Sequence, residues 1–191
     1  MSGQVRILEE EILSNNWYIL KKIKFDFQKK DGTWHTLSRE AYDRGNGAVI
    51  LLINKNQRTV ILTRQFRLPT FINGNADGML IEACAGLLDK DQPDVAIKRE
   101  TEEETGYKIK EVKKIFEVYM SPGSVTEILY FFVAEYSADE RVNVGGGIDS
   151  EDIEVLELGF DQAMAMISSG EIKDGKTIML LYHAQIHHLL G

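Results

Sequence analysis

The stretch Arg99-Glu100-Thr101-Glu102-Glu103-Glu104-Thr105-Gly106-Tyr107 carries the strongest signal in this chain. Pro93 precedes it, and a proline is typical of the first turn of a helix. Gly106 follows the run of acids, and a glycine is typical of the position just after a helix. The sequence therefore predicts a helix over residues 93–105 that ends in four glutamates and two threonines.

Three of these acids share one face of the predicted helix. Glu100 and Glu104 are four residues apart and Glu103 is their neighbour, so their carboxylates repel one another. No lysine or arginine lies between them. A divalent cation such as Mg²⁺ would turn this repulsion into coordination, because Mg²⁺ prefers carboxylate oxygens and phosphates. The alternative is an acidic face that simply contacts water.

Composition limits the class of protein. The chain has 191 residues, a net charge of −8 and a single cysteine, Cys84. This length predicts one domain, or one domain with an appended half. The negative charge disfavours nucleic acid and anionic membranes as partners, and the longest apolar runs are too short to span a bilayer. One cysteine excludes a disulfide framework, so we expect a cytoplasmic protein with a buried, inert thiol.

The first part of the chain differs from the rest. Residues 17–27 alternate apolar and polar side chains, which predicts a strand with one face in water. Lys30-Asp31-Gly32 is typical of a turn, and residues 34–42 resemble a second strand, so a hairpin is expected. A lone hairpin is barely stable in water. We therefore divide the chain into an N-terminal β subdomain, residues 1–44, and a main domain, residues 45–191.

Strands and helices do not alternate one for one in the main domain, which favours an α+β or mixed-sheet fold over a doubly wound parallel sheet. The expected strands cover residues 48–54, 59–66, 79–85, 112–120, 127–136 and 155–158. The expected helices cover residues 93–105, 160–168 and 177–190.

The acidic helix resembles the Nudix box, the motif of hydrolases that cleave nucleoside diphosphates linked to another group. The front of the motif departs from the family, because twelve residues separate Gly86 from Arg99 where the family has thirteen. The first glutamate of the motif therefore falls on Gln92 counted forward, or on Asp91 counted backward. The resemblance implies the Nudix fold, a mixed-sheet α/β/α sandwich. The end of the motif is matched by Arg99, Glu100, Glu103, Glu104 and Gly106.

Two segments outside the box indicate a branch of the family. Arg64-Gln65-Phe66-Arg67 and Pro122, sixteen positions after Gly106, resemble the ADP-ribose and nucleotide-sugar pyrophosphatases. Residues 43–47, 82–86 and 145–147 resemble the members that hydrolyse GDP-mannose to GMP and mannose 1-phosphate. We expect that reaction, with Mg²⁺ as cofactor. The alternatives are ADP-ribose as substrate, or a module that binds a nucleotide without cleaving it.

The residue types suggest roles in such a reaction. Glu100 and Glu104 are expected to bind Mg²⁺, because carboxylates one turn apart suit a pair of ions, with Glu103 a third ligand or an orienting partner. The resemblance adds the carbonyl of Ala85 as a ligand. It also adds a catalytic carboxylate on a loop after the glycines at 145–147, which we expect to act as a hinge. We choose Glu151 for this carboxylate, with Asp152 as second choice among Asp149, Glu151, Asp152 and Glu154.

The remaining assignments concern the substrate and the assembly. Arg67 is expected to bind a phosphate, and Arg64 either to do the same or to form a structural ion pair. Lys176, near a helix start, suits an anion, and Trp17 either stacks on the base or packs in a core. His183 and His187 are better explained by packing than by a metal. The resemblance implies a homodimer with exchanged N-terminal hairpins, and its implied substrate contacts are Trp17, Ser38, Arg39, Glu40, Arg67, Ala85, Gly86, Leu87, Glu104, Glu127, Ser150, Glu151 and Lys176.

Overall fold

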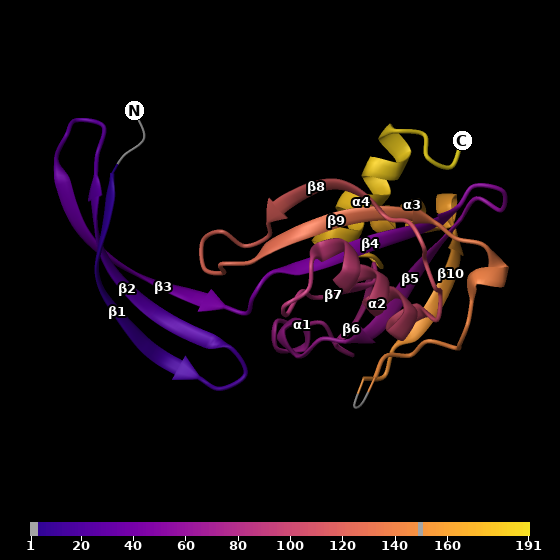
Figure 1. The fold of residues 1–191 in the computed structure, drawn as a ribbon, viewed down its shortest axis with the longest axis horizontal. Coiled ribbons are helices and arrows are strands. Elements are labelled where there is room, and N and C mark those ends of the chain that lie inside the picture. Colours follow the sequence, from indigo (N-terminus) through magenta and orange to yellow (C-terminus); the bar gives the residue numbers. More distant parts are fainter. Residues whose placement is uncertain (1–3, 149–150) are drawn as a thin grey trace. The chain divides into compact units, whose positions relative to one another are not determined.

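The computed structural model describes residues 4–148 and 151–191, and the chain forms two compact units. One unit contains Met1–Asn46 and Tyr119–Ile128, and the other contains Gly47–Val118 and Leu129–Gly191. Figure 1 shows the secondary structure of both units. Within the part of the chain that is described, no helix is long and apolar enough to cross a membrane.

The first unit is built on an antiparallel sheet with the order β1-β2-β3 (Figure 1). Its strands are β1 (Val5–Asn15), β2 (Ile19–Gln28) and β3 (Trp34–Asp43). The predicted hairpin is present as β2 and β3, with Gln28 opposite Trp34. Asp31 accepts hydrogen bonds from the backbone N–H of Thr33 at 2.9 Å and its hydroxyl at 2.6 Å. The predicted turn is therefore held by its own aspartate.

The strand β1 was not predicted, and the sheet has three strands rather than two. Its centre contains Glu9, Glu10 and Glu11, a residue type that is depleted in strands. The opposite strand supplies lysines, and Lys21 and Lys22 lie 3.7 Å and 3.5 Å from Glu10 and Glu11. Cross-strand pairing of opposite charges thus supports a strand whose own composition gives a weak signal.

A segment from much later in the chain completes the first unit. Residues 119–128 connect β8 (Lys113–Tyr119) to β9 (Ile128–Glu135). The Tyr42 N–H donates to the Ser124 carbonyl at 2.8 Å, and the Thr126 N–H donates to the Tyr42 carbonyl at 3.1 Å. The predicted division at residue 44 follows the chain, whereas the first unit also contains this later connection.

The second unit contains a seven-stranded mixed sheet with the order β10-β5-β4-β9-β8, in which β6 pairs with β5 and β7 pairs with β4. The strands β4 and β9 run parallel, while β4–β5, β4–β7, β5–β6 and β5–β10 are antiparallel. This is the mixed sheet that was predicted. Besides β8 and β9 its strands are β4 (Gly47–Asn54), β5 (Thr59–Phe66), β6 (Met79–Glu82), β7 (Ala85–Leu87) and β10 (Glu154–Gly159).

The predicted strand over residues 79–85 is wrong in one respect, because it breaks into β6 and β7. At the break the Ala83 N–H donates to the Thr177 hydroxyl at 2.7 Å, so a side chain replaces a strand partner. The Cys84 carbonyl still accepts from the Ile50 N–H at 3.0 Å. This break depends on a residue 94 positions away, which no local pattern reveals.

The acidic helix is α2 (Pro93–Thr105), with the bounds that were predicted. Gly106 has a φ of 79° and its N–H donates to the Glu102 carbonyl, the expected helix end. The short helix α1 (Leu68–Ile72) was not predicted, and α4 ends earlier than the expected residue 190. The other helices are η1 (Ala138–Glu140), α3 (Phe160–Ser169) and α4 (Gly175–Ile186).

The strand β4 is the centre of the core, and all eight of its residues are buried. Ile50 and Leu52 belong to the apolar cluster that includes Ile97 of α2. Successive side chains point to opposite faces, so Val49 and Leu51 lie on the other face, where α4 packs against β4. Figure 1 shows α2 and α4 on either side of this sheet. Each such aliphatic side chain contributes roughly 1.5–3 kcal/mol, which holds α2 firmly on the sheet.

Candidate active site

The helix α2 and the strand β7 meet at Gly86 and Glu100. A Cβ atom added to Gly86 would lie 2.1 Å from Cδ of Glu100, a distance that real Cβ atoms do not tolerate. Only glycine permits this approach of backbone to carboxylate. Ala85 is the neighbouring residue on β7 and pairs with Val49 of the core strand. The sheet therefore holds the Ala85–Gly86 backbone directly beside the acidic helix.

Glu104 is a buried carboxylate that lacks a full set of partners. It is 4% exposed, and its Oε2 atom has no hydrogen-bond partner among the described residues. Burial raises the pKa of Glu104 to about 7; the Cys84 thiol and Arg67 lower it, and Glu100 and Glu151 raise it further. A buried acid with an unpartnered oxygen requires an explanation, and a missing cation is one.

Glu100 has a similar environment. Burial raises the pKa of Glu100, Arg99 opposes this, and the charges of Glu103 and Glu151 add to it. The charge of Glu151 raises the pKa of both Glu100 and Glu104, so the three carboxylates lie within electrostatic range of one another. The buried donors here are carboxylate oxygens, the chemistry that suits a hard divalent cation. The residues present therefore fit a divalent metal.

The carboxylates are close enough to influence one another but are not drawn together. Across residues 4–148 and 151–191, no three histidine, cysteine, aspartate or glutamate side chains surround one point closely enough to hold an ion. Mutual repulsion keeps such oxygens apart when no cation lies between them. Binding a metal would thus require side-chain movements of Glu100, Glu104 or Glu151.

Arg99 supplies the positive charge that seemed absent from the acidic face. Its Nη1 atom lies 2.9 Å from Glu100 and 3.1 Å from Glu103, and its Nε lies 3.8 Å from Asp91. Glu103 is thus held by Arg99 one turn earlier, which suits the orienting role that was one of its two assignments. Asp91 also contacts this arginine, whereas Gln92 is the N-cap residue of α2. Of the two candidates for the shifted glutamate, Asp91 is the one that joins the network.

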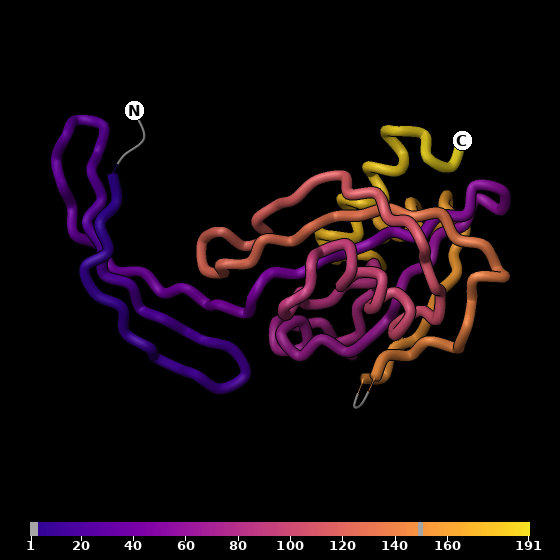
Figure 2. The backbone as a smooth tube through the Cα atoms, in the orientation of Figure 1, coloured from indigo at the N-terminus to yellow at the C-terminus, as the bar shows by residue number. Residues whose placement is uncertain are grey.

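The glycines at 145–147, which were expected to act as a hinge, contact the end of α2. Gly146 and Gly147 donate their N–H groups to the carbonyls of Glu104 at 2.9 Å and Glu103 at 3.1 Å. The φ values at 145–147 are 71°, 111° and 83°, which favour glycine. The last carbonyls of a helix need donors from outside, and this loop provides them. In this structure these glycines pack closely against the end of α2, and the hinge role stays a prediction. Figure 2 traces this connection between β9 and β10 in orange.

Glu151 lies on the same connection. Its Oε2 atom accepts from the Ile148 N–H at 2.9 Å, and a Cβ on Gly147 would lie 2.5 Å from that oxygen. The carboxylate is thus folded against the segment that caps α2. Asp152 is exposed, while Asp149 and Ser150 lie outside the described residues. Among the loop acids with described contacts, only Glu151 acts on both Glu100 and Glu104.

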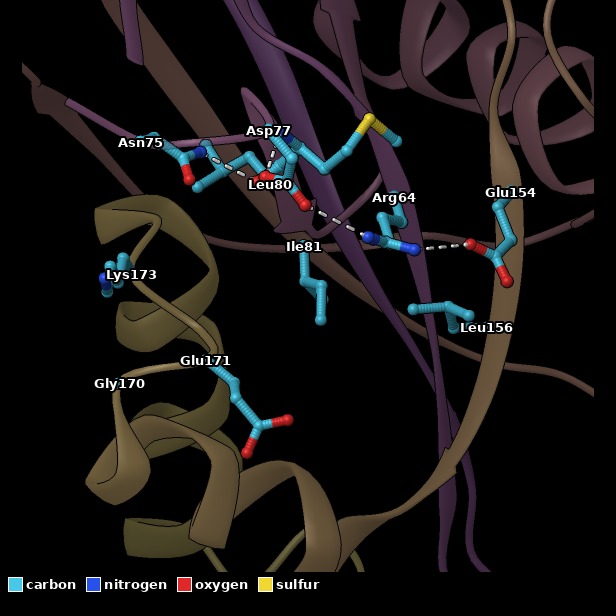
Figure 3. Close-up of a pocket in the computed structure, with 11 residues that line it drawn as sticks. Arg64, Asn75, Asp77, Leu80, Ile81, Glu154, Leu156, Gly170, Glu171 and Lys173 are labelled. Carbon is cyan, nitrogen blue, oxygen red and sulfur yellow. Dashed lines mark hydrogen bonds and ion pairs between the residues drawn. The ribbon is translucent and has the colours of Figure 1, made fainter. Parts of the chain in front are cut away.

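Arg64 takes the structural alternative that was left open for it. Its guanidinium lies 3.5 Å from Asp77 and 3.5 Å from Glu154, as Figure 3 shows. These residues line an open pocket of about 410 Å³ that also includes Glu171 and Lys173. All three paired side chains are exposed, so each pair is worth about 1 kcal/mol at most. Glu154, the last of the loop acids, is committed to this contact.

Arg67 and Lys176 are linked by a residue that the sequence reasoning missed. Arg67 Nε donates to Oε2 of Glu82 at 2.6 Å, and Lys176 Nζ donates to Oε1 of the same carboxylate. The Lys176 side chain is only 14% exposed, so it is not an ordinary surface lysine. Arg67 also lowers the pKa of Glu104, which places its charge near the acidic helix. The available signal was one acid in the apolar run 79–85.

Several of the predicted substrate contacts lie in the first unit, and most of them are exposed. Trp17 is 84% exposed, so its packing in a core was wrong, because the turn between β1 and β2 projects it into solvent. Ser38, Arg39 and Glu40 are exposed on β3. Glu127 lies 3.6 Å from Arg44 and is largely buried. All of these residues belong to the first unit. Trp17 and residues 38–40 are exposed to solvent, whereas Glu127 is not.

Two further assignments can be read from the structure. Cys84 is buried, and burial together with Glu104 raises its pKa well above the usual range, as expected for an inert thiol. His183 and His187 have ring centroids 4.3 Å apart, and Phe116 packs edge-on to His183. Burial, His187 and Lys113 lower the pKa of His183. Packing therefore accounts for this pair.

Comparison with known proteins identifies the family. The family model described as the NUDIX domain matches residues 43–180. The chain is a Nudix hydrolase. Members of this family generally act with a divalent metal ion, in agreement with the donor chemistry around Glu104. The predicted fold and enzyme class are confirmed.

The relatives of this Nudix hydrolase cover its whole length. It is 55% identical over 190 residues to the GDP-mannose pyrophosphatases of Shigella dysenteriae serotype 1 and Escherichia coli strain K12, with 100% of each chain covered. A second family model, described as the GDP-mannose pyrophosphatase NudK N-terminal domain, matches residues 4–42. A crystal structure titled as an ADP compounds hydrolase has a TM-score of 0.71 at 16% identity, over 97% of this chain and 93% of that one. That likeness shows the fold alone.

Proposed function

We propose that this Nudix hydrolase cleaves the pyrophosphate bond of GDP-mannose with Mg²⁺, giving GMP and mannose 1-phosphate. The observation that carries the proposal is Glu104, a buried carboxylate with an unpartnered oxygen beside two further acids. The full-length relatives that are 55% identical are GDP-mannose pyrophosphatases, which supports this substrate.

The proposed metal ligands are the carboxylates of Glu100, Glu104 and Glu151 and the carbonyl of Ala85. A divalent ion bound there would neutralise the charge of the pyrophosphate and lower the pKa of a water molecule. Glu151 removes the proton from the attacking water as general base. Glu103 supports this arrangement through Arg99, which it contacts at 3.1 Å. Together these residues bring the attacking water and the phosphates to one site.

The substrate contacts divide between the two ends of the nucleotide sugar. Arg67 and Lys176 bind the phosphates, since both are cations held by the buried carboxylate of Glu82. The backbone of residues 85–87, which includes Gly86 and Leu87, contacts the sugar-phosphate part of the substrate, as does Ser150. Trp17 stacks on guanine, and Ser38, Arg39, Glu40 and Glu127 contact the ligand by hydrogen bonds. Exposure of the Trp17 ring is consistent with such stacking.

The proposed assembly is a homodimer that exchanges its N-terminal sheets, so that residues 38–40 reach the site of the partner. The observation in support is the apolar surface of β1, because a sheet of this size rarely leaves such a surface in water. We place the enzyme in the cytoplasm, which suits an acidic chain whose single cysteine is a free thiol. The exposed apolar residues of β1 are Val5, Ile7, Leu8, Ile12 and Leu13.

The decisive experiment compares GDP-mannose and ADP-ribose as substrates, with Mg²⁺ and with EDTA, and separates the products by chromatography. We expect GMP and mannose 1-phosphate only with Mg²⁺, and faster than AMP from ADP-ribose. Faster AMP release would move the substrate to ADP-ribose. Tight binding of GDP-mannose in calorimetry without any product would instead indicate a binding module and contradict the proposal.

A further inference from the structure

Glu82 is a carboxylate at the end of β6 whose two oxygens are each occupied by a different cation. Its side chain is 3% exposed. Oε2 accepts from Arg67 Nε at 2.6 Å, and Oε1 accepts from Lys176 Nζ. A buried carboxylate requires such partners, so burial of Glu82 dictates where both cations lie.

The contact with Glu82 leaves the outer part of the Arg67 side chain free to act. Only Nε is used, and among residues 4–148 and 151–191 no hydrogen bond involves Nη1 or Nη2. The side chain is 38% exposed. A guanidinium fixed through Nε presents two parallel N–H donors, the geometry that recognises phosphate. The charge of Arg67 lowers the pKa of Glu104, so the guanidinium lies within electrostatic range of the acidic helix.

Lys176 is fixed in the same way from the other side. Its Nζ also donates to Asp174 Oδ1 at 2.9 Å, which uses two of its three protons. Asp174 is itself held as the N-cap of α4, where Oδ2 accepts from the Thr177 N–H at 2.9 Å. The Thr177 hydroxyl oxygen in turn accepts a hydrogen bond from the Ala83 N–H at 2.7 Å. The lysine is therefore anchored to both α4 and the sheet, with one proton left to donate.

We propose that Glu82 is a positioning residue for the diphosphate of the substrate. It holds Arg67 and Lys176 as a preformed pair of donors and does not touch the substrate itself. The inference rests on the proposed function, since the diphosphate is the group that the pair recognises. Preformed donors bind a ligand more tightly because fewer rotamers are lost on binding. A salt bridge that only stabilises the fold would have no such effect on the ligand.

A double-mutant cycle tests this coupling. GDP affinity is measured by calorimetry in Mg²⁺ for the wild type, Arg67→Ala, Glu82→Gln and the double variant, and kcat/KM is measured in parallel. Loss of one charge-assisted contact predicts a roughly tenfold to hundredfold weaker affinity in each single variant. The double variant should bind GDP much more tightly than the product of the two single losses would predict. Fully additive losses would overturn the inference, because a purely structural Glu82 would act independently of Arg67.

Two further variants keep the test sharp. Glu82→Asp keeps the charge but shortens the side chain, so it should fold even if Glu82→Gln does not, and its GDP affinity should fall between those of the wild type and Arg67→Ala. Arg64→Ala is the matched control, because Arg64 lies near the end of β5 and has two exposed acidic partners. Its GDP affinity should not change. Unaltered GDP affinity in Glu82→Asp and Glu82→Gln would contradict the positioning role.

The binding measurement also separates this inference from the proposed function. If the wild type binds GDP and the cycle shows coupling, but no nucleotide sugar is hydrolysed, the positioning role stands and the proposed reaction fails. If GDP-mannose is hydrolysed but the cycle is additive, the reaction stands and the positioning role fails. A wild type that binds no GDP would overturn both.

Discussion

Gly86 and Glu100 approach so closely that a Cβ on the glycine would lie 2.1 Å from the carboxyl carbon of the glutamate. At this point only the Glu100 side chain lies between the strand β7 and the helix α2. This contact fixes the distance between the sheet backbone at Ala85 and the acids of α2. A site built in this way has little tolerance for added volume, because packed interiors yield only at a cost.

Gly86→Ala is expected to destabilise the protein by about 1–3 kcal/mol, the usual cost of overpacking, and to lower kcat by displacing Glu100. Urea unfolding and GDP-mannose hydrolysis measure the two effects. Gly123→Ala is the control, since a Cβ there meets nothing within 4 Å and its φ is not in the glycine-favouring region. Equal behaviour of the two variants would mean that Gly86 and Glu100 are not tightly packed in solution.

Glu100→Gln and Glu104→Gln should each lower kcat by roughly 100-fold or more, because a metal ligand is lost while the shape is kept. Mn²⁺ binding, followed by electron paramagnetic resonance, should weaken in parallel. Glu102→Gln lies on the same helix, where Glu102 only pairs with Lys108 at 3.5 Å on the surface. Its activity and metal affinity should be those of the wild type. Full activity in both ligand variants would refute the metal assignment.

The stability of the metal-free protein should fall as pH rises. The folded pKa of Glu104 is raised from 4.5 to about 7, so the folded state holds this proton more tightly than the unfolded state. The resulting stability is complete below pH 4.5 and is lost as pH rises through 7, by about 3 kcal/mol from this group. Urea unfolding in EDTA at pH 5 and pH 8 measures the change.

Glu104→Gln provides the control for the pH effect, because glutamine has no charge to bury. Its stability should vary less between pH 5 and pH 8 than that of the wild type. Addition of Mg²⁺ at pH 8 should stabilise the wild type and have little effect on the variant. An identical pH dependence of the two proteins would show that Glu104 is not the group responsible.

Gly147→Ala should impair catalysis through Glu151. A Cβ at this position would lie 2.5 Å from Oε2 of Glu151, so the carboxylate must move. Gly32→Ala has a similar backbone strain, with a φ of 85°, but its Cβ meets nothing within 4 Å. Both variants should lose about 1–2 kcal/mol of stability, whereas only Gly147→Ala should lower kcat. A comparable kcat in the two would argue against a role for the loop carboxylate.

The exposed apolar face of β1 should be buried in a dimer. Light scattering at micromolar concentration is expected to give twice the mass of 21.7 kDa, and Ile12→Lys, at a residue that is 61% exposed, should shift the protein toward monomer. Ile186→Lys changes an exposed isoleucine of α4 and should leave the mass unchanged. A monomeric wild type would refute the proposed assembly.

Features that depend on neighbouring residues could be predicted from the sequence alone. The bounds of α2 follow from Pro93 and Gly106, and the buried strand β4 follows from its unbroken apolar run. The motif formed by Arg99, Glu100, Glu103, Glu104 and Gly106 was enough to indicate the Nudix family, and the metal site on this helix stays a prediction. Such features are local, because helix ends and strand faces are set within a few residues along the chain.

Which distant side chains share a partner became visible only in the folded chain. Glu82 joins Arg67, 15 residues away, to Lys176, 94 residues away, and no spacing in the sequence indicates that meeting. The glycines at 145–147 were predicted as a hinge, and the structure adds that Gly146 and Gly147 donate to the carbonyls of Glu104 and Glu103 at the end of α2. The sequence does not distinguish a glycine that allows movement from a glycine that is tightly packed. Long-range burial distinguishes them, since it requires each buried polar group to find a partner wherever the fold places one.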